Sequence, residues 1–95
     1  MFAISFDMSI ADLKKYYNGE SYNNAYFDIR MVLRKYAFYN TQGSVYLSEN
    51  RNMANLFKAI EVLKNIEWFR LSVRDIRVFR IEDWSDFTDY IKATQ

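Results

Sequence analysis

Bulky apolar residues alternate with small or polar residues at the start of the chain. The bulky set is Phe2, Ile4 and Phe6, and the small or polar set is Ala3, Ser5 and Asp7. This period of two predicts a strand over Met1–Asp7, with one bulky side facing a core. The other side is made of small residues and ends in a carboxylate, so we expect another surface to pack closely against it.

Two longer segments have the spacing of amphipathic helices. From Ser21, a suitable N-cap, apolar residues recur at helical intervals as far as Tyr36. A second amphipathic helix follows a cap at Asn50 or Asn52. The residues expected to form its buried side are Met53, Leu56, Phe57, Ile60 and Leu63.

Shorter signals stand before and after these helices. Ser9 followed by Asp12 resembles a capping pattern and predicts a short helical turn through Leu13. Trp68 and Phe69 are expected to close the end of the second helix against the core.

Two further stretches are rich in residues that favour strands. Phe38–Ser48 is predicted to be extended and interrupted at Gly43 by a tight turn or bulge. Val73–Glu82 is predicted to be the last strand, and its apolar residues on both sides predict that both faces are covered. Ser85 is then expected to cap a short C-terminal helix, docked by apolar residues. These are Phe87, Tyr90 and Ile91.

The order strand, helix, strand, strand, helix, strand predicts an α+β ferredoxin-like sandwich over residues 1–95, a single domain with a short C-terminal helix. Two helices would cover one face of the sheet. The other face would expose residues for which exposure is unfavourable. These are Ala3, Ser5, Phe79 and Ile81. We therefore expect a homodimer formed through this sheet face.

The amino-acid composition excludes several kinds of catalytic and metal-binding site. The chain has no Cys and no His, which excludes disulfide scaffolds, Cys/His zinc sites, thiol nucleophiles and Ser-His-Asp triads. A formal net charge of +1 gives no overall electrostatic signal for nucleic acid. No stretch approaches the roughly 20 apolar residues that span a bilayer, so we expect no membrane association and a cytoplasmic location.

Asp7 is the sharpest candidate for chemistry. In a dimer built on the sheet face, both copies of Asp7 would approach one cleft, where paired carboxylates could hold Mg²⁺ or Mn²⁺. The alternative is that Asp7 only caps a loop or accepts a hydrogen bond from a backbone amide. Arg74 and Arg77 could bind phosphate groups, or could pair with Asp75 at a strand edge.

The segment from Gln42 to Ser44 likewise has one functional and one purely structural interpretation. Its backbone amide and hydroxyl could approach a ligand, or Gly43 could simply form a turn. Ser44 cannot be a triad nucleophile, because the chain has no histidine to activate it.

Several blocks of sequence resemble the virulence-associated protein D (VapD) family of bacteria. They are Phe6-Asp7, Thr41 to Tyr46, Met53 to Phe57, Trp68-Phe69, Val73 to Arg77, Phe79 to Glu82 and Trp84 to Thr88. The resemblance implies a ferredoxin-like homodimer with endoribonuclease activity on single-stranded RNA or mRNA. It also implies similarity to the small nuclease of CRISPR adaptation, in which an Asp ends the first strand.

The same resemblance assigns roles to individual residues. It makes Asp7 the catalytic residue, as general base or as ligand of Mg²⁺ or Mn²⁺, and it makes Gln42, Ser44, Arg74 and Arg77 substrate-binding residues. It further implies a toxin that is neutralised by a small antitoxin protein, or a stand-alone virulence-associated ribonuclease. The alternative is a catalytically inactive dimer that binds nucleic acid or serves in assembly.

Overall fold

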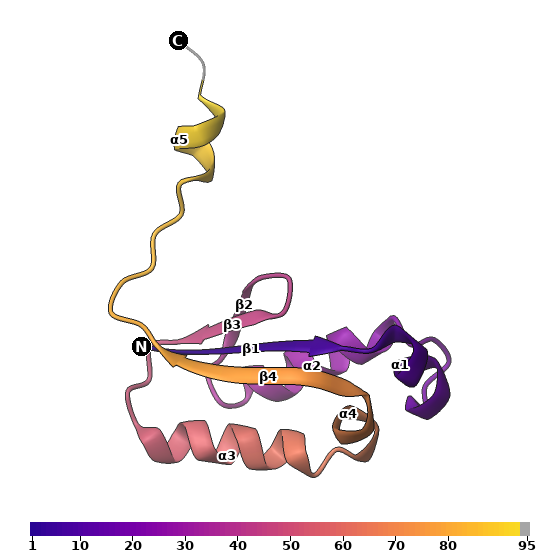
Figure 1. Ribbon diagram of the computed structural model, residues 1–95. Helices are drawn as coiled ribbons and strands as arrows, with labels where there is room; N and C mark the ends of the chain where they lie inside the picture. The colour runs from indigo at the N-terminus through magenta and orange to yellow at the C-terminus, as the bar shows by residue number, and fades with distance from the viewer. Residues whose placement is uncertain (94–95) are drawn as a thin grey trace.

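A four-stranded antiparallel sheet in the order β2-β3-β1-β4 forms the centre of the fold (Figure 1). The computed structural model describes residues 1–93. The strands are β1 (Phe2–Met8), β2 (Tyr39–Gln42), β3 (Val45–Ser48) and β4 (Val73–Arg80). β1 lies between β3 and β4 and pairs antiparallel with both. This arrangement confirms the predicted α+β, ferredoxin-like fold.

Helices cover one face of this sheet and leave the other face open (Figure 1). The helices are α1 (Ile10–Tyr16), α2 (Asn24–Arg34), α3 (Met53–Lys64), α4 (Glu67–Ser72) and α5 (Thr88–Lys92). The bulky residues of β1 are buried beneath α2 and α3, as their alternation predicts. We call the uncovered side of the sheet the open face.

Two of the predicted caps are confirmed by hydrogen bonds. The Ser9 hydroxyl accepts from the backbone N–H of Asp12 at 3.2 Å. The Asn52 side-chain oxygen accepts from the backbone N–H of Ala54 at 2.9 Å, so Asn52 rather than Asn50 caps α3. Both bonds satisfy N–H groups that have no partner within the helix itself.

The predicted start of α2 at Ser21 is wrong. The carbonyl of Ser21 accepts from Asn24 at 3.0 Å and its hydroxyl accepts from Asn23 at 3.3 Å. These bonds form a separate turn, and α2 begins at Asn24 without a side-chain cap. Serine satisfies a turn as readily as a helix start, and the sequence pattern does not distinguish the two.

The buried side of α3 differs from the prediction at two residues. Leu56 and Leu63 are buried, and Ala59 is also buried between them. Met53 and Phe57 are 49% and 64% exposed, so their predicted burial is wrong. The small side chain of Ala59 takes the buried position on this side of the helix.

Trp68 and Phe69 pack against the core, as predicted, but from the separate helix α4. The ring of Phe69 lies 5.5 Å from that of Phe6, edge to face. Trp68 packs edge to face on Tyr17, with ring centroids 4.8 Å apart. The extended backbone of Ile66 separates α3 from α4, and no glycine or proline marks that break in the sequence.

The prediction that both faces of the last strand are covered is wrong for the single chain. β4 is an edge strand, and Ile76, Val78 and Phe79 are 37%, 42% and 47% exposed. The strand ends at Arg80 rather than at Glu82. Ala3, by contrast, is buried although it lies on the open face, because Leu47 and Phe79 flank it on the neighbouring strands.

The C-terminal segment leaves the body of the molecule, and α5 stands apart from the sheet and the other helices (Figure 1). Ser85 does not cap this helix, because the Asp86 carboxylate instead accepts from the Thr88 N–H at 2.8 Å. The predicted docking of α5 is wrong within one chain. Its apolar residues Phe87, Tyr90 and Ile91 are all strongly exposed. The radius of gyration is 15.0 Å, against roughly 12 Å for a compact chain of this length.

Candidate active site

Asp7 lies at the end of β1 and points to the open face. Its neighbours Phe6 and Met8 are both 4% exposed and face the core, so the alternation of the strand directs Asp7 outward. The Phe6 ring stacks on Tyr46 at a centroid distance of 5.6 Å and meets Phe69 edge to face. Asp7 is therefore an exposed carboxylate beside buried aromatic rings, and it lies on the small-residue side of the strand, as the alternation predicts.

Burial also changes the pKa of Tyr46, one of the aromatic residues next to Phe6. Desolvation raises the pKa of the buried Tyr46 phenol above its ordinary value of 10.0. The hydroxyl therefore keeps its proton to higher pH than an exposed tyrosine does.

The register of β4 places two more charged residues beside Asp7. Asp75 is directly opposite Asp7, and Arg77 is directly opposite Ser5. Directly opposite residues of antiparallel strands have Cα atoms about 4.5–5.5 Å apart. Arg77 donates through Nε to Asp75 Oδ2 at 3.0 Å and to Oδ1 at 3.3 Å. We call Asp7, Asp75 and Arg77 the open-face cluster.

Arg74 is near this cluster in the chain but does not bond to it. The register shifts between Asp7 and Met8, where Met8 pairs with Val73, so Arg74 is the extra residue of a bulge. It is exposed, and among residues 1–93 the structure shows no ion pair or side-chain hydrogen bond for it. Of the two predicted arginines, only Arg77 is held beside Asp7.

Gln42 and Ser44 lie at the tip of the β2–β3 hairpin. Gly43 between them has a φ of +49°, a conformation that favours glycine. The Ser44 carbonyl accepts from the Phe6 N–H at 3.3 Å, which places the hairpin tip next to the end of β1 that carries Asp7. The structure thus brings Gln42 and Ser44 to the same end of the sheet as the cluster, but shows no side-chain bond between them and it.

The sequence analysis missed Asn40, which holds this hairpin. Its side-chain amide donates to the Gly43 carbonyl at 2.7 Å and to the Val45 carbonyl at 3.2 Å. Arg30 of α2 in turn donates to the Asn40 side-chain oxygen at 3.3 Å. An asparagine three residues before a turn glycine is a usable signal, because asparagine commonly bonds to nearby turn backbone.

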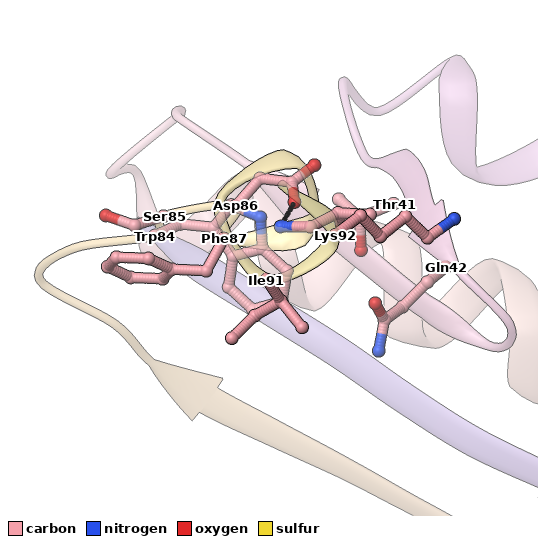
Figure 2. Close-up of a pocket in the computed structure, with 9 residues that line it drawn as sticks. Thr41, Gln42, Trp84, Ser85, Asp86, Phe87, Ile91 and Lys92 are labelled. Atoms are coloured by element: carbon pink, nitrogen blue, oxygen red, sulfur yellow. Dashed lines mark hydrogen bonds between the residues drawn. The ribbon is translucent and has the colours of Figure 1, made fainter. Parts of the chain in front are cut away.

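A hollow with a volume of about 690 Å³ lies elsewhere, between the C-terminal segment and β2. Figure 2 shows Trp84, Asp86, Phe87 and Ile91 on one side of it and Thr41 and Gln42 on the other. Gln42 is the one predicted site residue in its lining. The hollow exists because the C-terminal segment stands away from the sheet, and it does not include the open-face cluster.

Comparisons with known proteins point to one family. A family model described as CRISPR associated protein Cas2 matches residues 1–89. "Endoribonuclease VapD" of Dichelobacter nodosus is 55% identical over 93 residues, which cover 98% of this chain and 99% of that protein. The chain belongs to the VapD endoribonuclease family. The resemblance drawn from the sequence blocks is thereby confirmed.

Other VapD proteins match along nearly the same length. "Endoribonuclease VapD 1" of Riemerella anatipestifer is 58% identical over 85 residues, which cover 90% of this chain and 94% of that protein. "Endoribonuclease VapD" of Helicobacter pylori is 52% identical and is covered completely. No helix within residues 1–93 has both the length and the apolar character needed to cross a membrane.

Proposed function

We propose that this protein cleaves single-stranded RNA at the open-face cluster, with Asp7 as the catalytic residue. The observation that carries the proposal is the rigid placement of an exposed carboxylate beside a guanidinium group on one sheet face. Asp7 takes the proton from the attacking hydroxyl as its oxygen bonds to phosphorus. The bond from phosphorus to the leaving ribose oxygen breaks, and that oxygen takes a proton from water. Arg77 binds the phosphate through its free nitrogens and stabilises its negative charge.

The donor set of the cluster suits Mg²⁺ or Mn²⁺. Asp7 supplies carboxylate oxygens at the end of β1, and Mg²⁺ is commonly held by one or two carboxylates plus substrate phosphate and water. Residues 1–93 of a single chain contain no group of three or more such ligands. A bound metal ion would activate water and neutralise charge on the scissile phosphate. Asp7 is its proposed ligand, and in a dimer the second copy of Asp7 would be the other donor.

We propose further that two copies join through the open face. Tyr39, Leu47 and Phe79 share one row of this face, and Tyr39 and Phe79 are 54% and 47% exposed. A two-fold contact there would bury this row and bring both copies of Asp7 toward one cleft. The exposed apolar residues of α5 would also gain a surface in such a dimer.

The biological role we propose is that of the toxin of a toxin–antitoxin pair, or of a stand-alone virulence-associated ribonuclease, acting in the cytoplasm. A small antitoxin protein is the proposed partner in the first case. Expression in bacteria tests this role. Growth arrest by the wild-type protein, absent with Asp7→Asn, supports a toxin, whereas equal growth of both strains contradicts it.

The activity itself is tested by cleavage of an end-labelled single-stranded RNA. We expect the wild-type protein to cleave and Asp7→Asn to lose roughly 100-fold or more, the range for removal of a general base. The variant should fold at least as well as the wild type, because it removes one of two like charges that face each other across β1 and β4. A parallel reaction with EDTA determines metal dependence.

Glu61→Gln is the matched control, because Glu61 is an exposed carboxylate on α3, on the other side of the sheet. It should cleave as well as the wild type. Equal cleavage by Asp7→Asn would place the active site elsewhere. RNA binding without cleavage by any of these proteins would identify a binding module instead.

A further inference from the structure

We propose that Asp75 is a positioning residue for RNA: its carboxylate holds Arg77 through Nε, so that both terminal nitrogens of the guanidinium face a substrate phosphate beside Asp7. The proposal rests on the function proposed above, which places substrate at this cluster. It adds a role for a carboxylate that does not itself touch the reacting atoms.

The geometry of the ion pair supports this role. Nε lies 3.0 Å from Asp75 Oδ2 and 3.3 Å from Oδ1, so the carboxylate engages the inner nitrogen of the guanidinium. A guanidinium carries five N–H donors in a fixed plane, of which Nε supplies one. Within residues 1–93 the two terminal nitrogens of Arg77 make no hydrogen bond. Four donors therefore remain, in the forked arrangement that binds phosphate.

The register directs this fork toward Asp7. Asp75 and Arg77 are two residues apart on β4 and hence on the same face, opposite Asp7 and Ser5 respectively. Arg77 is therefore the diagonal neighbour of Asp7, and such neighbours lie about 7–8 Å apart across antiparallel strands. Both side chains extend from the same face of the sheet, so one phosphate group can approach both of them. The strands fix both residues on one sheet, so their spacing does not depend on a loop.

The stability of the fold does not explain why position 75 carries a carboxylate. The side chains of Arg77 and Asp75 are 69% and 54% exposed, and exposed ion pairs contribute only about 0–1 kcal/mol. Asp75 also faces Asp7 directly, and like charges in that position destabilise a sheet. A neutral residue at position 75 would serve the fold better, so the advantage of the carboxylate lies in how it holds Arg77.

A positioning role for Asp75 and a purely electrostatic role predict opposite changes in RNA affinity when Asp75 is removed. Asp75 adds negative charge beside an RNA site, so its removal should tighten RNA binding if charge alone matters. If Asp75 positions Arg77, its removal should weaken binding, because the guanidinium then loses its fixed orientation. The two effects can therefore be told apart by the direction of the change.

The experiment measures binding of a fluorescently labelled single-stranded RNA in the Asp7→Asn background, where no cleavage is expected. Asp75→Ala should weaken binding roughly 3- to 10-fold, the loss of about one net hydrogen bond. Asp75→Asn keeps an acceptor oxygen for Nε and should recover part of this loss. Glu82→Gln, an exposed carboxylate just beyond β4, should leave binding unchanged or slightly tighter.

A double variant shows whether Asp75 acts through Arg77. In an Arg77→Ala background, Asp75→Ala should no longer weaken binding and should tighten it, since only the charge remains to be removed. In the presence of Asp7, Asp75→Ala should raise KM with little change in kcat, because it removes a binding interaction. Thermal unfolding should show Asp75→Ala to be at least as stable as the wild type.

Unchanged or tighter RNA binding by Asp75→Ala would overturn the proposal, as would an equal loss in the Arg77→Ala background. These outcomes differ from a failure of the proposed function. An absence of cleavage by the protein with Asp7 in place refutes the nuclease activity, while the binding series still tests Asp75. If no variant binds RNA, both proposals fail together.

Discussion

The two faces of β1 use the same seven-residue strand for different purposes. On the helix-covered face, Phe2, Ile4, Phe6 and Met8 are all 5% exposed or less and contact α2, α3 and α4. On the open face, Ser5 and Asp7 reach solvent and face charged residues of β4. One strand therefore provides both the core and the candidate active site, and each buried residue fixes the direction of its exposed neighbour.

Because of this division, we expect substitutions at adjacent residues of β1 to affect different properties, either stability or activity. A change on the covered face should unfold the protein before it alters chemistry. A change on the open face should alter chemistry or association while the fold remains. The following predictions test that separation.

The largest effect on stability is expected from Phe6→Ala. Phe6 is 4% exposed, stacks on Tyr46 and meets Phe69 edge to face, and such truncations typically cost about 3–5 kcal/mol. Urea denaturation measures the free energy of unfolding. Ser5→Ala, one residue away on the open face, should change it by less than about 0.5 kcal/mol. Comparable losses for both variants would contradict the division of β1 into two faces.

A smaller effect, on association alone, is expected from Phe79→Asp. Phe79 lies on the open face opposite Ala3, in the row proposed to meet a second copy. A charge there should raise the dimer dissociation constant roughly tenfold or more, as for loss of a buried aromatic contact at an interface. Sedimentation equilibrium gives this constant.

Val78→Asp is the matched control for the dimer, because Val78 is the next residue of β4, is similarly exposed and faces the helix side. It should leave the dissociation constant near the wild-type value. If Val78→Asp separates the copies and Phe79→Asp does not, the contact between them uses the helix side.

The smallest effect is a pH dependence that comes from the covered face. Burial raises the pKa of Tyr46 above 10.0, its ordinary value. The unfolded chain therefore loses this proton at lower pH than the folded protein, and the free energy of unfolding should fall as pH rises above 10. Below that range Tyr46 is neutral in both states and its contribution is complete.

Tyr46→Phe should reduce this decline and Tyr39→Phe should not, because Tyr39 is exposed on the open face. Some dependence should remain from Tyr17, whose pKa is raised by its hydrogen bond to Asp28. Denaturant unfolding between pH 8 and 11 measures the slope. An unchanged slope in Tyr46→Phe would contradict the assignment.

The sequence by itself determined the order of the four strands and the two long helices, the buried side of β1 and the position of Asp7 at its exposed end. It did so because the alternation in β1 and the helical spacing in α2 reflect contacts that each element makes along its whole length. The absence of His and Cys likewise restricted the chemistry to carboxylates and other oxygen and nitrogen groups.

Only the tertiary structure decided which residues lie next to Asp7. The neighbours Asp75 and Arg77 come from a strand more than sixty residues away in the chain, and a shift of one residue in the register would have turned both to the other face. The tertiary structure also decided the exposure of Met53, Phe57 and the apolar residues of β4, which the sequence pattern wrongly predicted to be buried. Periodicity shows that a residue belongs to the apolar side of a helix or strand. Whether another element covers that side depends on the width of the layer packed against it and on which strand lies at the edge of the sheet.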